Sequence, residues 1–158
     1  MNASVSIANL RVEELVAHIS STDVSPGAGS AGAVALALAA ACASKAASVS
    51  LKHHPDELEL RSALASFTKI ARLALTGADR DSEAFAEFIH ERDSASIDRL
   101  VCEGEKVSRL IATLATIIEE IEARIRPNMT GDLVAAKALM GAARRIQQRD
   151  EDEALQVR

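Results

Sequence analysis

Aromatic residues are scarce in this chain: its 158 residues include three Phe, no Trp and no Tyr. Hydrophobic residues nevertheless make up 48% of the sequence, so a core must be built from Ala, Leu, Ile and Val. Such side chains suit closely packed helices. The length is typical of one domain with a sizeable core, and we expect a single domain over residues 1–158 that ends in a charged tail at residues 149–158.

Cysteine and histidine are also few, and their spacing does not fit a metal site. The two cysteines, Cys42 and Cys102, are far apart and form no C-x-x-C motif. His53 and His54 are adjacent in a predicted loop and resemble a solvated turn, and the four histidines form no recognisable ligand motif with the cysteines. We therefore interpret the cysteines as small reduced hydrophobic residues and expect no metal ion.

Positive charge is not in excess, which excludes one broad class of partner. The net charge is −5, so the chain has no basic face for nonspecific binding to nucleic acid. No basic segment precedes an apolar one near Met1, and we expect a cytoplasmic protein. Residues 31–43 carry no charge, but Ala is only weakly apolar and a membrane span needs about 20 strongly apolar residues. We expect no membrane association.

Strand-like alternation is absent, and the periodic segments have helical spacing. Val12, Leu15, Val16 and Ile19, for example, recur at i, i+3, i+4 and i+7. We predict helices over about residues 9–19, 30–51, 57–89, 96–124 and 130–146, with Thr130 as the N-cap of the last. The expected fold is an all-α bundle of five to six helices with a central Ala-rich helix.

The segment "SPGAGSAGAVALALAAACASKAASVS" opens with a glycine turn and continues as the Ala-rich helix. Gly27, Gly29 and Gly32 match the G-x-G-x-x-G pattern, but a helix rather than a strand precedes them, which argues against dinucleotide binding. Small side chains favour a place at the bundle centre. The first turn exposes unpaired N–H groups that a ligand could approach, and Ser30 adds a hydroxyl. The alternative is a tight turn with no ligand.

Asp81 interrupts an apolar helical face. Steps of three and four place it on one face with all three aromatic residues and three alanines: Phe67, Ala71, Ala74, Ala78, Phe85 and Phe88. A carboxylate on such a face is costly unless it is paired, and burial raises its pKa toward the range useful in proton transfer. Asp81 is therefore either a candidate catalytic group or half of a buried ion pair with an Arg or Lys.

Two further polar residues lie near the predicted start of the last helix. Asp132 falls in its first turn, where acidic residues are common because of the helix dipole. Asn128 precedes it in a loop and is either a site group or a turn former. The sequence pattern alone does not decide whether Asn128 and Asp132 have a structural or a functional role.

Three segments together resemble a known family. "LRVEELVAHISSTDVSPGAGSAGAVALALAAACA", "DRDSEAF" and "RPNMTGDLVAAKALMGAA" are similar, in order and spacing, to the formiminotransferase-cyclodeaminase C-terminal family, which includes methenyltetrahydrofolate cyclohydrolases. The resemblance extends over about residues 10–143. It implies a cyclohydrolase-like helical bundle that forms a homodimer. It also implies a tetrahydrofolate derivative as substrate, with no permanently bound cofactor.

The resemblance also implies roles for individual residues. Asp81 corresponds to the Asp of the family's D-x-x-A-F motif and is the expected proton shuttle, with Asp132 as a second catalytic carboxylate. The implied substrate-binding residues are Gly27, Gly29, Ser30, Phe85 and Asn128. Arg126, Lys137, Arg144 and Arg145 are candidates for the carboxylate tail of a folate.

The implied reaction is the hydrolysis of methenyl-tetrahydrofolate to formyl-tetrahydrofolate. The alternatives are the cyclodeamination of formimino-tetrahydrofolate, and a role as a folate-binding or structural subunit of a larger complex. Hydrolysis is favoured because no formiminotransferase segment accompanies the domain. Three departures bear on activity: Ala28 stands where the family has a glycine, Gly131 where it has a serine, and "RRIQQRD" where it has a different closing segment.

Overall fold

The backbone of residues 6–157 is described by the computed structural model, as are their side chains except those of residues 151 and 154–157. This part of the chain is helical and contains no strand. The α-helices are α1 (Val12–Ile19), α2 (Ala28–His53), α3 (Leu58–Glu91), α4 (Ser94–Ile121) and α5 (Thr130–Val157). Short 3-10 turns span Ile7–Asn9, Glu122–Arg124 and Pro127–Met129. The predicted all-α bundle of five to six helices is confirmed.

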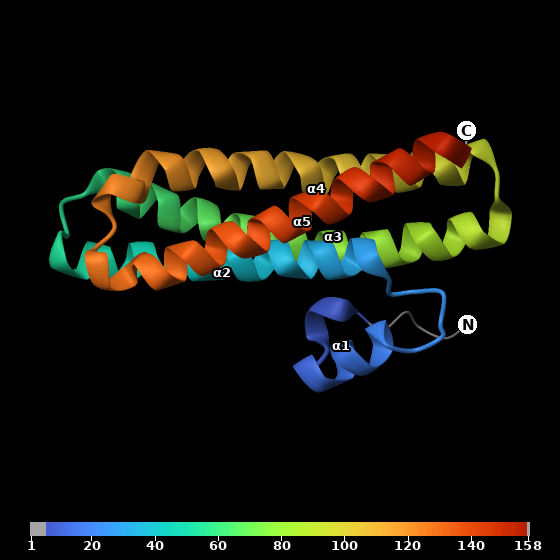
Figure 1. Ribbon diagram of the computed structural model, residues 1–158, viewed down its shortest axis with the longest axis horizontal. Helices are drawn as coiled ribbons and strands as arrows, with labels where there is room; N and C mark the ends of the chain where they lie inside the picture. The colour runs from blue at the N-terminus through green and yellow to red at the C-terminus, as the bar shows by residue number, and fades with distance from the viewer. Residues whose placement is uncertain (1–5, 158) are drawn as a thin grey trace.

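Helices α2 to α5 form an up-and-down bundle, and the short α1 lies beside it (Figure 1). Helices that are consecutive in sequence run antiparallel, so α2 and α4 point one way and α3 and α5 the other. The loops that join them are short, as expected for antiparallel neighbours. Consequently the start of α2, the end of α3, the start of α4 and the end of α5 share one end of the bundle.

The Ala-rich α2 is the central helix, as predicted. It packs against α3, α4 and α5, and twelve of its residues are buried. The absence of a side chain at Gly32 allows α5 to come close, since a Cβ there would lie 3.0 Å from Cγ2 of Ile146. By length and composition alone α2 could also cross a membrane, but the core helix of a bundle gives the same signal.

The apolar face of α3 is buried as the periodicity indicated. Phe67, Ala74 and Ala78 are buried against the rest of the bundle, and Asp81 follows one turn later on the same face. Asp79 points elsewhere and is not simply a solvated charge. It accepts hydrogen bonds from the hydroxyl of Ser6, at 2.8 Å, and from the backbone N–H of Ile7, and so fixes the start of the described chain against α3.

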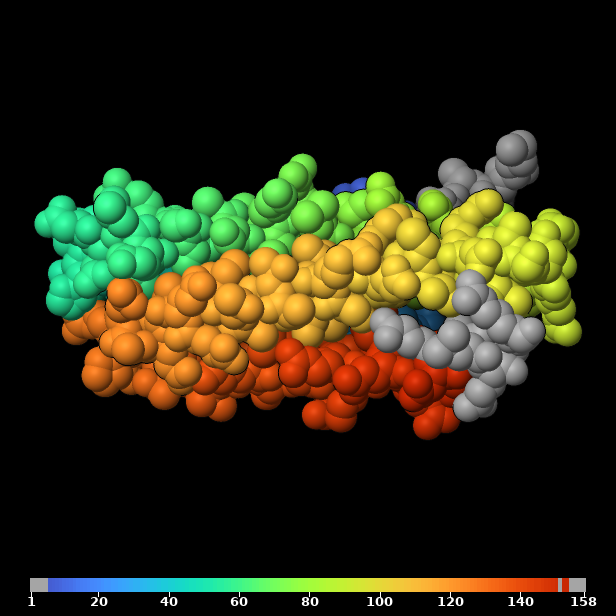
Figure 2. All heavy atoms as spheres, turned by 90° about the horizontal axis from the view of Figure 1, so that it is seen from above, coloured from blue at the N-terminus to red at the C-terminus, as the bar shows by residue number. Residues whose placement is uncertain are grey.

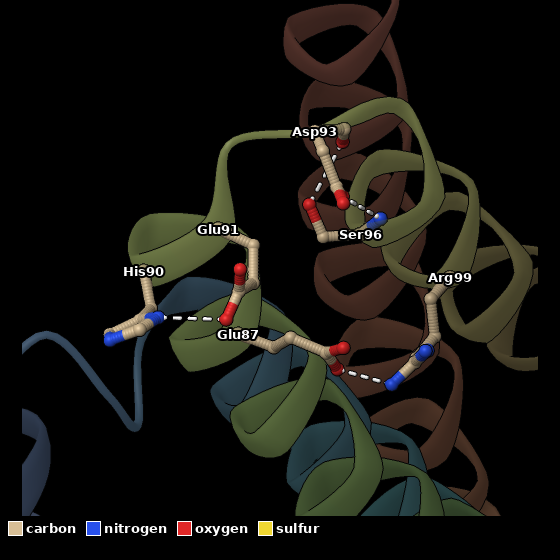
Figure 3. Close-up of polar contacts among 6 residues, drawn as sticks. All are labelled: Glu87, His90, Glu91, Asp93, Ser96 and Arg99. Atoms are coloured by element: carbon tan, nitrogen blue, oxygen red, sulfur yellow. Dashed lines mark hydrogen bonds and ion pairs between the residues drawn. The ribbon is translucent and has the colours of Figure 1, made fainter.

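The turn between α3 and α4 is held by local polar contacts (Figure 3). Arg92 ends α3 in the left-handed region, with φ of 51°. Asp93 then caps α4 by accepting a hydrogen bond from the backbone N–H of Ser96 at 2.8 Å, which holds the pKa of Asp93 below its usual value. An ion pair between Glu87 and Arg99 joins the two helices beside this turn.

The predicted helix ends agree with the structure to within three residues, except in α5. Thr130 is the first residue of α5 with helical backbone angles, so the prediction that it is the N-cap is wrong. Its hydroxyl instead donates to the carbonyl of Pro127 at 2.8 Å. The predicted end at Ile146 is also wrong: α5 continues through the charged segment to Val157, because no Gly or Pro interrupts it.

Candidate functional site

A cavity of about 300 Å³ opens where the start of α2 meets α3, α4 and α5. In Figure 2 it is the hollow between α4 and α5, with blue atoms of the N-terminal part of the chain visible inside. The residues that line it are Gly27, Ala28, Gly29, Asp81, Phe85, Phe88, Ile97, Leu100, Val101, Gly104, Gln147, Asp150 and Glu153. Its size falls at the lower end of the range for small-molecule sites.

Asp81 is fixed at the bottom of this cavity by the first turn of α2. The hydroxyl of Ser30 lies 2.8 Å from Oδ2 of Asp81, and the backbone N–H of Ser30 also donates to this carboxylate. Ser30 itself is fully buried. Gly27 caps α2 without a side-chain hydrogen bond, so the carboxylate of α3 takes the place that a capping side chain would occupy. Asp81 has no Arg or Lys partner among the residues that the structure describes, which argues against the ion-pair alternative.

Gly29 is required by the close approach of Asp81. A Cβ at position 29 would lie 2.7 Å from Oδ2 of Asp81 and closer still to Oδ1. No described glycine has positive φ, so the role of Gly29 is to make room rather than to permit an unusual backbone. Ala28 likewise does not have positive φ, and its methyl group causes no backbone strain where the family has a glycine.

The loop before α2 is anchored next to the same carboxylate. The hydroxyl of Ser25 contacts the hydroxyl of Ser82 and lies 3.0 Å from its backbone carbonyl oxygen. Ser82 directly follows Asp81 on α3. The glycine turn and Asp81 are therefore held together on both sides, by Ser25 and by Ser30.

Burial raises the pKa of Asp81 above the ordinary value of 3.8. The hydrogen bonds from Ser30 act in the opposite direction, and the nearby charge of Glu103 on α4 adds to the increase. Glu103 is largely buried and pairs with Lys106 at 2.6 Å. A carboxyl group that faces a cavity, has a raised pKa and has no basic partner among the described residues can both accept and return a proton.

The cavity has one apolar wall and one acidic wall. Phe85 and Phe88 of α3 and three aliphatic residues of α4 form the apolar wall, while α5 supplies Asp150 and Glu153. No Lys or Arg is among the described residues that line the cavity. Glu153 pairs with Arg149 at 2.8 Å, so the charge of the acidic wall is partly compensated. The apolar wall suits a flat ligand, and the lack of a lining Lys or Arg disfavours an anion.

Comparison with known proteins connects this arrangement to a family. The sequence profile described as Formiminotransferase-cyclodeaminase matches residues 11–98, which is 88 of the 158 residues. The chain belongs to the Formiminotransferase-cyclodeaminase family. The matched segment includes the glycine turn, Asp81 and Phe85. It excludes all of α5, which supplies the acidic wall of the cavity.

The fold of this family member is similar to that of a solved protein. The crystal structure of formiminotetrahydrofolate cyclodeaminase from Thermotoga maritima superimposes with a TM-score of 0.88 at 20% sequence identity. The match covers 94% of this chain and 79% of that one. At this identity the likeness concerns the fold. No curated protein sequence matches the chain.

The structure groups most, but not all, of the residues that the family resemblance assigns. Gly27, Gly29, Asp81 and Phe85 line the cavity, and Ser30 lies beneath Asp81 without lining it. Asn128 and Asp132 are at the other end of α2, where Asp132 lies 3.6 Å from Lys45. Ser30 and Lys45, which contact the two carboxylates, are fifteen residues apart on α2, a rise of about 22 Å along the helix axis, so Asp81 and Asp132 belong to different ends of the bundle.

Sequence reasoning missed the contribution of α5. Gln147, Asp150 and Glu153 line the cavity, although the segment that contains them was expected to be a solvated tail. Their spacing at i, i+3 and i+6 places them on one helical face, and the absence of Gly or Pro after Ile146 allowed the helix to continue. The candidate folate-tail residues Arg126, Lys137, Arg144 and Arg145 do not line the cavity.

Proposed function

We propose that this protein hydrolyses methenyl-tetrahydrofolate to formyl-tetrahydrofolate. The observation that carries the proposal is the carboxylate of Asp81, which is held by Ser30 over Gly29 and faces a cavity with an apolar wall. Membership of the Formiminotransferase-cyclodeaminase family supports a folate that carries a one-carbon unit as the substrate.

The charge of the cavity suits this substrate. Methenyl-tetrahydrofolate carries a positive charge spread over N5, the bridging carbon and N10. The described lining contains three carboxylates and no Lys or Arg. The apolar wall with Phe85 and Phe88 provides a surface for a flat ring. The negatively charged tail of the folate must then extend out of the cavity.

In the proposed reaction Asp81 acts first as a base and then as an acid. Water adds to the bridging carbon while Asp81 accepts one of its protons, which leaves a neutral hydroxyl adduct. The bond from that carbon to N5 then breaks, N5 takes the proton from Asp81, and the hydroxyl proton passes to solvent as the formyl C=O forms. The balance is one water consumed and one proton released. A positioned carboxyl group contributes about 10²–10⁴-fold to such proton transfers.

A second reaction is supported by the fold neighbour, whose name is formiminotetrahydrofolate cyclodeaminase. In that reaction N10 attacks the formimino carbon of the substrate and ammonia leaves, which gives the methenyl compound. Asp81 would accept the proton from N10 and return it to the departing amine. The same carboxyl group and the same cationic centre serve both reactions.

The proposal includes a cytoplasmic homodimer with no permanently bound cofactor. Asn128 and Asp132 can take part in the reaction at Asp81 only if a second copy brings its far end to the cavity, because the α2 residues that contact the two carboxylates are about 22 Å apart along the helix axis. A non-catalytic folate-binding subunit of a larger complex is the alternative if turnover is absent.

The test follows the absorbance of methenyl-tetrahydrofolate mixed with purified protein, and in parallel the ammonia released from formimino-tetrahydrofolate. We expect faster loss of the methenyl absorbance than in buffer. Release of ammonia alone would select the second reaction. Folded protein that accelerates neither reaction would contradict an enzymatic role.

A further inference from the structure

Gln147 of α5 is a buried polar side chain whose amide has no hydrogen-bond partner among the described residues. Only 3% of the residue is exposed, yet it lines the cavity beside Asp81. Its amide carries two N–H donors and a carbonyl acceptor. Buried polar groups in proteins are almost always paired, so an unpaired amide at a cavity wall indicates a group reserved for a ligand.

The amide of Gln147 lies between α2 and α4, beside two glycines. A Cβ at Gly32 would lie 3.5 Å from Nε2 of Gln147, and a Cβ at Gly104 would lie 3.5 Å from its Oε1. The side chain thus passes between α2 and α4 with its nitrogen toward one helix and its oxygen toward the other. This packing limits the orientations of the amide, whose donors and acceptor are adjacent on a side chain that lines the cavity.

The neighbours of Gln147 define what its amide can recognise. The same cavity has the apolar wall with Phe85 and Phe88, against which a ring can lie flat. An amide beside such a ring matches an edge on which an N–H donor and a C=O acceptor are adjacent, as in a cyclic amide. Two hydrogen bonds to one edge fix the orientation of the ring as well as its identity.

We propose that Gln147 is a specificity-determining residue that binds the cyclic-amide edge of the bicyclic ring of the substrate. The proposal rests on the proposed function, because that function supplies a substrate with a pterin ring. It assigns recognition of the ring to α5, outside the segment that matches the family profile. Asp81 then acts on the one-carbon unit while Gln147 holds the ring.

The experiment compares two small probes on the whole protein. Pterin carries the cyclic-amide edge, and quinoxaline is a bicyclic ring of similar size without it. Calorimetry measures the affinity of each probe for the wild type, for Gln147→Met, which keeps the length of the side chain, and for Gln148→Met, the exposed neighbour on α5. The KM and kcat for methenyl-tetrahydrofolate are measured on the same three proteins.

We expect the wild type and Gln148→Met to bind pterin more tightly than quinoxaline, and Gln147→Met to lose that preference by about tenfold through weaker pterin binding. For the same reason Gln147→Met should raise KM and leave kcat within a few-fold. Its thermal stability should equal or exceed that of the wild type, because an unpaired buried amide is removed. A purely structural role for Gln147 would lower the stability instead.

Two results overturn the proposal while leaving the proposed function intact: equal pterin affinity in the wild type and Gln147→Met, or turnover with unchanged KM in the variant. Wild-type protein that binds pterin in a Gln147-dependent way but turns over neither folate would contradict the proposed function instead. Failure of the wild type to bind pterin overturns the inference, and the turnover assay then judges the function separately.

Discussion

The two ends of α2 each bury a serine, and the two serines do different things. Ser30, near the start, contacts the carboxylate of Asp81 at 2.8 Å beneath a cavity. Ser50, near the end, donates to the carbonyl of Ala46 at 2.8 Å and accepts from the backbone N–H of Arg126 at 3.0 Å. Both are fully buried, but only Ser30 is bound to a group that can titrate.

The same contrast holds for the two acidic residues that the family resemblance assigned to catalysis. Asp81 is a partly buried carboxylate with no basic partner in the described part of the chain, and its pKa is raised by burial. Asp132 lies near the protein surface beside Lys45, at the first turn of α5. Within one chain, therefore, the start of α2 carries the features of a chemical site, and its far end carries those of a structural junction.

The sharpest test of this contrast is Asp81→Asn. We expect turnover to fall by at least about 100-fold, because the proton acceptor is lost. Stability at neutral pH should rise, because a carboxylate that burial disfavours is replaced by a neutral group. Steady-state rates and thermal unfolding measure the two effects, with Glu119→Gln on the exposed face of α4 as the control. Wild-type rates in Asp81→Asn would remove Asp81 from the mechanism.

Gly29→Ala tests the cavity at the start of α2 without changing any charge. The added methyl group would fall within 2.7 Å of Oδ2 of Asp81, so the carboxylate must move. We expect a loss of turnover of about tenfold to 100-fold from this displacement. Gly131→Ala at the far end is the matched control, since a Cβ there meets nothing within 4 Å. Equal rates in the two variants would show that the carboxylate position is not critical.

Asp132→Asn tests whether the far end joins the reaction through a second copy. We expect a loss of about tenfold or more, as for the removal of a catalytic group. Mixing inactive Asp81→Asn with Asp132→Asn under conditions that exchange subunits should then restore part of the activity, because one of the two shared sites is intact. Sedimentation at several concentrations establishes the dimer. Wild-type turnover in Asp132→Asn would leave the far end purely structural.

The smallest effects are expected for the two serines. Ser30→Ala removes a hydrogen bond that stabilises the ionised carboxylate, so the pKa of Asp81 should rise further. The rate should therefore begin to fall at a higher pH as the solution is acidified. Ser50→Ala should lower stability by about 1 kcal/mol and leave the pH profile unchanged. Rate–pH profiles of both variants measure the difference, and identical profiles would separate Ser30 from the titration of Asp81.

The pH dependence of stability should follow the direction of each pKa shift, so the contribution of Asp81 to stability and its contribution to the rate change oppositely with pH. Because the pKa of Asp81 is higher in the folded protein than in the unfolded chain, its contribution to stability is fully present below the unfolded value of 3.8. It is lost as the pH rises through the raised folded value. Asp93 acts oppositely: its lowered pKa adds stability that is lost on acidification. Asp81→Asn should remove only the first of these contributions.

Much of this arrangement could be predicted from the sequence, because it rests on local periodicity. The helix positions follow from apolar spacing, and the interruption of the α3 face singled out Asp81. The small residues of α2 indicated its central place. The proximity of Asp81 to Gly29 could only be hypothesised, since a contact between residues 52 positions apart depends on how α2 and α3 align.

The contribution of Gln147 and the rest of α5 could not be predicted in this way. A charged helical segment usually faces solvent, and nothing in its composition shows that another helix begins beside it. Whether Asp150 and Glu153 line a cavity depends on the antiparallel packing of α5 against α2, which is a tertiary property. A charged segment that follows a predicted helix without Gly or Pro can therefore continue that helix and contribute residues to a site.

The cavity draws its walls from residue 27 at one extreme and residue 153 at the other. During synthesis, the glycine turn leaves the ribosome long before the residues that complete the opposite wall. A nascent chain therefore cannot close the pocket around a small molecule until residue 153 has emerged. Any ligand that stabilises the finished protein would be unable to assist the early stages of folding, and its effect would begin only with the docking of the final helix.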